Sequence, residues 1–188
     1  MAKRDLLRNL ARLGAVVFLA ALAFAPCLLR ASDVPGAISG WDVDGHPVSI
    51  NAKGHYTLVM YTNPDLEDES RAMTIALDPY RSRSNLDFVR VVDMRGDVPP
   101  SMRSMVRSQI RKEEAKECAR LKKAGVDAPA GSAPIIPDFS GSTLDALGWG
   151  STYDEVQVVI YDPHGKEVKR LASVTDAKQV TRVVESVL

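Results

Sequence analysis

The stretch that determines the fold is residues 56–68, which read YTLVMYTNPDLED. Its opening run, YTLVMYT, is rich in β-branched and aromatic residues, a composition typical of a central strand buried in a sheet. Asn63-Pro64-Asp65 then breaks the strand, because proline cannot donate to a strand ladder. Acidic residues follow at positions 65 and 67–69, which suit the N-terminus of a helix. The stretch therefore predicts a buried strand that passes directly into a helix.

Strand and helix patterns alternate along the rest of the chain, which favours an α/β layer architecture. Residues 125–134 are rich in Gly, Ala and Pro and predict an exposed connection. The other predicted elements are a short opening strand at 46–50, a strand at 86–94, a long helix at about 101–124, a helical turn at 143–149, strands at 156–161 and 166–172, and an amphipathic helix at 175–188.

The two later strands form a hairpin with a recognisable turn. Residues 158–168 read VVIYDPHGKEV, in which Pro163 fixes φ and Gly165 allows a positive φ. This segment resembles the strand-turn-strand of thioredoxin-like and peroxiredoxin-like proteins, and the order of elements over 42–188 is similar to the thioredoxin fold. The resemblance implies a three-layer fold, with a mixed central sheet flanked by helices and a long inserted basic helix. Residues 136–188 are most similar to the periplasmic YtfJ-like branch.

The chain departs from the redox-active members of that superfamily where the first core strand ends. Those members place Cys-x-x-Cys at the start of the following helix, whereas Asn63, Pro64 and Asp65 occupy the position here. Dithiol chemistry needs one activated thiolate and a second, resolving thiol. The cis-proline of the superfamily would fall near Glu155 or Val156, and it is also missing. The resemblance thus implies a groove lined by these five residues, without dithiol chemistry.

The N-terminal 32 residues predict a signal peptide. Lys3, Arg4, Arg8 and Arg12 precede the apolar run Leu13–Ala25, and Leu29-Arg30-Ala31 offers a cleavage site. Cleavage would leave one domain at 33–188, located in the periplasm or otherwise outside the cytoplasm. An uncleaved inner-membrane anchor over residues 13–29, with the domain outside, is one alternative. Lipidation at Cys27 is another, although Pro26 departs from the bacterial lipoprotein pattern.

The predicted helix at 101–124 is strongly basic. It carries eight basic and three acidic residues. Residues 1–32 hold five of the 24 basic and one of the 24 acidic residues of the chain, so the remaining domain has a net charge of about −4. The helix could therefore contact an anionic membrane surface, an acidic protein or the acidic face of its own domain. Arg103, Arg107 and Arg111 share one face and are the candidates for such a contact, with a solvated outer face as the alternative.

Cys118 is the one cysteine outside the predicted signal peptide. It falls on a loose apolar stripe with Met105, Ile110 and Leu121, which predicts a buried and inert thiol. Nearby Lys116, Arg120 and Lys122 favour the alternative of an active thiolate.

No metal site or cofactor is predicted. The three histidines are scattered, and the acids at 65 and 67–69 point around the helix, so capping explains them better than a shared cation.

The sequence thus predicts an exported, redox-inactive thioredoxin-like domain that acts as a binding or assembly module in the cell envelope. We expect an envelope protein as partner, with contact to a membrane surface as a further option. Nucleic acid is excluded as a partner, because export removes it and aromatic residues do not alternate with the basic ones. The alternative function is a thiol-dependent oxidoreductase or peroxidase that uses Cys118.

Overall fold

The computed structural model describes residues 37–51, 54–96, 98–126, 133–149 and 154–188. The predicted signal peptide lies outside these residues. Among the residues that are described, no helix is long and apolar enough to span a bilayer. The strands are β1 (Ser39–Trp41), β2 (Pro47–Ser49), β3 (Tyr56–Thr62), β4 (Leu86–Asp93), β5 (Ile135–Asp138), β6 (Val156–Tyr161) and β7 (Glu167–Val174). The α-helices are α2 (Glu67–Ala76), α3 (Arg103–Lys123), α4 (Ser142–Ala146) and α5 (Ala177–Val187).

A five-stranded mixed sheet forms the centre of the fold, in the order β5-β4-β3-β6-β7. Strands β3, β4 and β5 are parallel, whereas β6 is antiparallel to β3 and β7 is antiparallel to β6. A separate two-stranded hairpin, β1-β2, precedes the sheet. The run YTLVMYT is the central strand β3, as predicted, and all of its residues after Tyr56 are buried.

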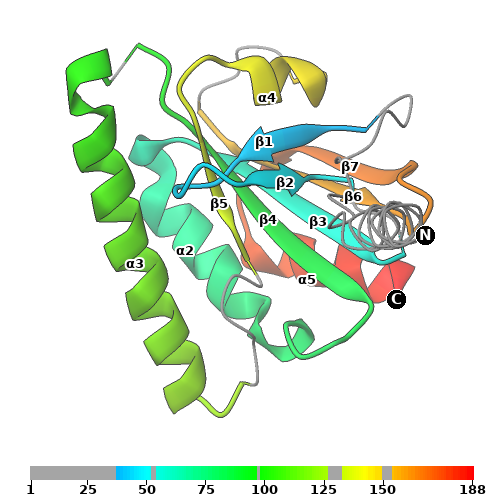
Figure 1. Ribbon diagram of the computed structural model, residues 1–188. Helices are drawn as coiled ribbons and strands as arrows, with labels where there is room; N and C mark the ends of the chain where they lie inside the picture. Colours follow the sequence, from blue (N-terminus) through cyan, green and yellow to red (C-terminus); the bar gives the residue numbers. More distant parts are fainter. Residues whose placement is uncertain (1–36, 52–53, 97, 127–132, 150–153) are drawn as a thin grey trace, which may run out of the picture. The chain divides into compact units, whose positions relative to one another are not determined.

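Helices and the hairpin cover both faces of this sheet (Figure 1). On one face, Leu58 of β3 and Phe88 of β4 pack with Met73 of α2 and Val184 of α5. The opposite face packs against α4 and the β1-β2 hairpin, because alternate residues of the same strands point that way. The predicted three-layer α/β fold with its long inserted helix is therefore confirmed.

Helix α3 is joined to this body mainly by charged and polar groups. Of its 21 residues, only Ile110 and Leu121 are buried. Near the middle of the helix, the Arg111 guanidinium lies 2.6 Å from Asp44 Oδ1. Near its C-terminal end, both terminal nitrogens of Arg120 donate to the Asp78 carboxylate, at 2.6 and 2.8 Å. The predicted apolar stripe is wrong at its start, where Met102 and Met105 are 44% and 58% exposed.

Two local assignments also need correction. The N-cap after β3 is Asn63 and not Asp65, because the Asn63 side chain accepts from the backbone N–H of Leu66. Residues 135–138, to which the sequence assigned no element, form the edge strand β5. Hydrogen bonding from an adjacent strand decides this assignment, since four residues that include Pro137 have little strand signal of their own.

A buried polar cluster lies at the carboxyl ends of the three parallel strands. The Tyr61 hydroxyl donates to Asp93, and Arg95 donates to both oxygens of the same carboxylate. Asp138, the partner of Asp93 in the β4-β5 register, accepts the backbone N–H groups of Gly141, Thr143 and Leu144. These bonds supply acceptors to the start of α4, so this edge of the sheet is fixed by buried carboxylates.

Replacing Asp93 by asparagine should destabilise the domain in a pH-dependent way. Burial alone would raise the pKa of Asp93, but hydrogen bonds from Arg95 and Tyr61 hold the pKa below its ordinary value of 3.8. Its stabilising contribution is thus complete above about pH 5 and is lost as the pH falls through the folded-state pKa. We expect Asp93→Asn to lower the free energy of unfolding by about 2–3 kcal/mol near pH 7. Urea unfolding of both proteins at several pH values measures this difference in the free energy of unfolding.

The difference between wild type and Asp93→Asn should narrow below about pH 4, where Asp93 takes up a proton in the unfolded chain before it does so in the folded protein. The exposed Asp154→Asn serves as control and should change stability by less than about 0.5 kcal/mol. A difference that stays constant down to about pH 2 would show that the charge of Asp93 does not stabilise the fold.

Removing the Arg120 side chain should loosen α3 more than removing Lys116. Each of these residues pairs with a glutamate three positions earlier, at 2.7 Å, but only Arg120 also binds Asp78 outside the helix. We expect Arg120→Ala to reduce stability by about 1 kcal/mol and Lys116→Ala by less than about 0.5 kcal/mol. Hydrogen exchange of the α3 amides measures the local effect. Equal exchange rates in the two variants would contradict an anchoring role for Arg120.

Candidate functional site

The junction between β3 and α2 carries no sulfur. Asn63, only 9% exposed, stands where β3 ends, and its Oδ1 accepts from Leu66 N at 3.1 Å. Pro64 begins the short 3₁₀ turn that leads into α2. Within the described part of the chain, Cys118 is the only cysteine, and it lies on α3. The structure therefore confirms that this junction presents an amide and a proline to its surroundings.

A cavity of about 550 Å³ extends from this junction, and we call it the α2–α3 cavity. Asn63 and Pro64 line it together with residues of α2, α3, β4 and β5. Its apolar lining is contributed by Ile75, Val92, Met94, Val106, Ile110 and Ile135. Two of the predicted groove residues thus border a real cavity, which runs between the two helices and above the sheet.

The charges around the α2–α3 cavity are largely paired with one another. Arg71 pairs with Glu67, Lys116 with Glu113 and Arg120 with Glu117, at 2.6, 2.7 and 2.7 Å. The hydrogen bonds from Arg120 hold the pKa of Glu117 below its ordinary value. Arg90 of β4 also lines the cavity, and its side-chain Nε is buried without a hydrogen-bond partner within the described structure.

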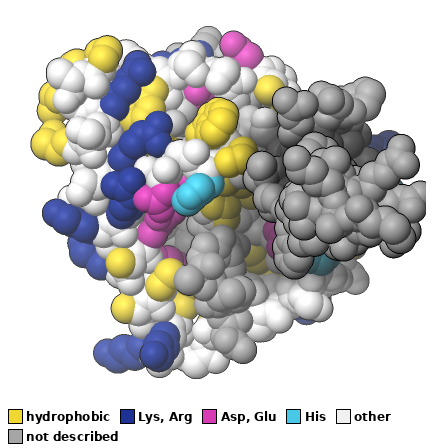
Figure 2. All heavy atoms as spheres, in the orientation of Figure 1, with side chains coloured by type: hydrophobic (Ala, Val, Ile, Leu, Met, Phe, Trp, Pro, Cys, Tyr) yellow, Lys and Arg dark blue, Asp and Glu magenta, His cyan; other side chains and the backbone are white. Residues whose placement is uncertain are grey.

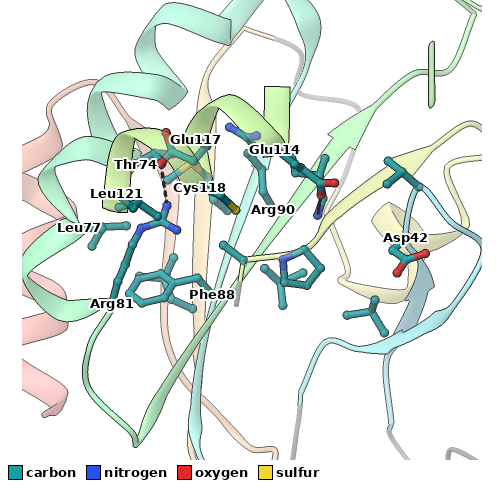
Figure 3. A pocket seen from close by; sticks show the side chains of 18 of the residues that line it. Asp42, Thr74, Leu77, Arg81, Phe88, Arg90, Glu114, Glu117, Cys118 and Leu121 are labelled. Carbon is teal, nitrogen blue, oxygen red and sulfur yellow. Dashed lines mark hydrogen bonds and ion pairs between the residues drawn. The ribbon is translucent and has the colours of Figure 1, made fainter. Parts of the chain in front are cut away.

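A second cavity, of about 490 Å³, lies next to the first, and we call it the Cys118 cavity. Thr74, Arg90, Glu117 and Ile135 line both cavities. Figure 3 shows that the side chains of Arg81, Arg90, Glu114 and Cys118 lie around this second cavity. Burial raises the pKa of the Glu114 carboxyl even though its Oε1 accepts from the backbone N–H of Ile135.

Cys118 is exposed, so the prediction of a buried thiol is wrong. Cys118 lies between the buried residues Ile110 and Leu121 of α3. These two are the only buried residues of the helix, so the body of the domain does not cover the whole predicted stripe. Arg120, one of the basic residues expected beside Cys118, forms ion pairs with Asp78 and Glu117. Instead, the cationic side chains that line the same cavity are Arg81 and Arg90, which the sequence analysis did not select.

The three arginines proposed to bind an anionic partner contact their own domain. Arg107 donates to the backbone carbonyl of Asp42, and Arg111 binds the carbonyl of Val43 as well as the Asp44 carboxylate. The Arg103 guanidinium lies 5.1 Å from the centre of the Phe139 ring. Figure 2 shows acidic side chains beside the row of basic side chains that runs along α3. Of the alternatives left open, self-docking on an acidic segment is the one seen for Arg107 and Arg111.

The remaining candidates do not join the α2–α3 cavity. Asp65 and Glu155 are exposed and line neither cavity, and the Val156 side chain is buried in the core against α5. The described residues contain no cis peptide bond.

One group of potential metal ligands was not foreseen. Asp42, Asp44 and His46 place one ligand atom each within 4.8 Å of one another. The Asp42 oxygens already accept from backbone N–H groups of the same turn, and Asp44 is paired with Arg111. Those contacts explain why the three side chains lie close together.

Sequence reasoning missed Arg90 and Arg81, the most unusual charges of the site. A signal was present for Arg90, because it is the only basic residue of the strand LDFVRVVD and has apolar residues on both sides. A charge in a strand that neighbouring strands enclose must face a cavity, a partner or the sheet edge. Arg81 follows α2 in a turn, where an arginine gives no comparable signal.

Comparisons with known proteins support the fold. No family model matches the chain, and no curated protein matches it. Among solved structures, the chain is similar to the MTB protein DsbF, with 18% identity, a TM-score of 0.52 and coverage of 81% of this chain and 96% of that one. It is also similar to the exposed lipoprotein thioredoxin Etrx1 of Streptococcus pneumoniae, with 14% identity, a TM-score of 0.53 and coverage of 80% and 99%.

A third similar structure is that of a putative thiol-disulfide oxidoreductase from Bacteroides vulgatus, with 14% identity, a TM-score of 0.51 and coverage of 84% and 90%. At these identities the likeness concerns the fold and not the chemistry. The chain therefore has a thioredoxin-like fold.

Proposed function

We propose that this domain binds a small organic ligand in the α2–α3 cavity and acts as a non-dithiol binding module outside the cytoplasm. The single observation that carries the proposal is Asn63, an amide at the mouth of a cavity of about 550 Å³ where dithiol chemistry would need a thiol. The chain holds two cysteines, at positions 27 and 118, so no Cys-x-x-Cys motif exists anywhere in it.

The cavity has the properties of a small-molecule site. Its volume lies within the range of about 300–1,000 Å³ that is usual for such sites, and its walls are mainly apolar with a few polar groups. It also lies between two helices above the sheet, so a ligand would contact several elements at once. The extracytoplasmic location follows from the export pattern of residues 1–32, and an envelope protein partner remains a prediction.

Cavity-directed binding can be tested by methyl NMR with a panel of neutral and charged organic compounds. We expect compounds that bind to shift the methyl signals of Ile110, Ile135 and Val92, which line the α2–α3 cavity. Ile75→Trp should abolish these shifts, because Ile75 lies at the cavity and is 46% exposed, so a larger ring can fill the entrance. Val168→Trp makes a comparable change on β7, away from both cavities, and should leave them intact.

Methyl shifts confined to residues outside the α2–α3 cavity would overturn the proposed site. A panel in which no compound shifts any cavity methyl would overturn ligand binding as the function.

The second candidate function is thiol chemistry at Cys118. It is favoured by the exposure of this thiol and by its place in the lining of a cavity, which leave the sulfur accessible to a substrate disulfide. A single thiolate could attack a disulfide and form a mixed disulfide while one sulfur leaves as a thiolate. A thiol from outside the domain would then have to reduce that intermediate.

If binding is the function, a disulfide reductase assay should give background rates for both wild type and Cys118→Ser. Ligand binding uses no thiol, whereas glutathione would supply the external thiol that resolves a mixed disulfide if Cys118 formed one. Insulin reduction in the presence of glutathione measures this, with Ser104→Ala on α3 as a matched control. Turnover by wild type and Ser104→Ala that Cys118→Ser loses would favour the thiol function instead.

A further inference from the structure

Arg90 is the one basic side chain lining the α2–α3 cavity that forms no ion pair within the described structure. The other basic side chains that line the cavity, Arg71, Lys116 and Arg120, each form an ion pair with a glutamate that also lines it. Both oxygens of Glu117, the acid shared by the two cavities, accept from Arg120. The side chains that line the α2–α3 cavity therefore carry one positive charge in excess, with four basic residues against three glutamates.

The environment of Arg90 makes this excess charge costly. Its Nε is buried and has no hydrogen-bond partner within the described structure. Burial also lowers the pKa of the guanidinium, and the charges of Glu117, Glu114 and Glu67 only partly offset that effect. An arginine stays protonated even so, which means that the protein carries a desolvated cation beside an apolar space. A carboxylate placed there would supply the charge-assisted bonds that the guanidinium lacks.

The lining of the cavity describes the rest of the ligand. Besides charged residues and five uncharged polar ones, the walls contain aliphatic side chains from both helices and the sheet, such as Ile75 of α2, Val106 of α3 and Val92 of β4. These surfaces favour a hydrocarbon body. A single unmatched guanidinium also matches one negative charge, whereas a phosphate dianion would bring a second charge without a partner.

We propose that the α2–α3 cavity selects a small amphipathic carboxylate, whose carboxylate group pairs with Arg90 and whose hydrocarbon body contacts the aliphatic walls. This inference rests on the proposed function and adds the chemical class of the ligand. It assigns to Arg90 a positioning role for the head group. Binding of neutral compounds in the same cavity would fulfil the proposed function without requiring Arg90.

The test compares octanoate, octanol, octylamine and octyl phosphate, which share a hydrocarbon tail and differ in head group. Titration calorimetry with the purified domain should show octanoate binding at least about tenfold more tightly than octanol and than octyl phosphate. Octylamine should bind most weakly, because its charge is repelled by Arg90. In Arg90→Met, the preference for octanoate over octanol should disappear while octanol still binds.

Arg83→Met is the matched control, because Arg83 lies over the Tyr80 ring and lines neither cavity. It changes the net charge equally and should keep the preference for octanoate. Thermal unfolding gives an independent readout: the melting temperature of Arg90→Met should be unchanged or higher, since a desolvated and unpaired charge is removed. A clear decrease would show that Arg90 has a structural role, and would overturn its assignment to a ligand.

The remaining outcomes separate the two proposals. Equal affinity for octanoate and octanol, insensitive to Arg90→Met, would refute the carboxylate inference and retain the proposed function. Tightest binding of octyl phosphate would refute it in favour of a phosphate head group. If none of the four compounds binds at millimolar concentration, the carboxylate inference fails, and the NMR panel then decides the proposed function separately.

Discussion

The structure depends on the way in which α3 is held over the sheet by charges. A helix that packed through a full apolar face would fill the space beneath it, as α5 does with Val180 and Val184. Helix α3 buries only Ile110 and Leu121, and it is fixed instead by Arg111 on Asp44 and by Arg120 on Asp78. Ion pairs fix position without filling volume, so cavities remain between α3, α2 and the sheet.

Arg90 occupies a position where an apolar residue would make the fold more stable. An apolar residue at this point of β4 would continue the alternation of Phe88 and Val92 on the same face and would avoid the desolvation of a charge. The energetic cost of keeping an arginine there is local, and the surrounding sheet, buried on both faces, can tolerate it. Such a conflict between local stability and residue type is more often found at binding sites than in a structural core.

Elements with a strong local pattern could be predicted from the sequence, and those that depend on tertiary contacts could not. β3, β6 and α5 were found because their composition or periodicity is strong over the whole element. β5 was missed because its strand character comes from pairing with β4. The exposure of Cys118 was also missed, since helical spacing identifies a face but does not show how closely the body covers it.

The sequence predicted the junction after β3 but not the cavity beside it. The junction after β3 could be identified because Asn63 and Pro64 follow directly on a buried strand. The cavity beside it could not, because it exists only where residues of α2, β4 and α3 meet across large separations in sequence. The net charge of α3 pointed to an anionic partner, yet three of its eight basic side chains pair inside the domain, with Asp44, Asp78 and glutamates of the helix itself.

The β3–α2 junction forms a closed turn beside the α2–α3 cavity. The first N–H groups of a helix have no partner within the helix and can stabilise an anion. At this junction the Leu66 N–H already donates to the Asn63 side chain, so Asn63 uses that group to close the turn. Asn63 and Pro64 thereby form a border of the α2–α3 cavity. The charge available to a ligand then comes from other residues of the lining, among them Arg90, whose Nε has no hydrogen-bond partner within the described structure.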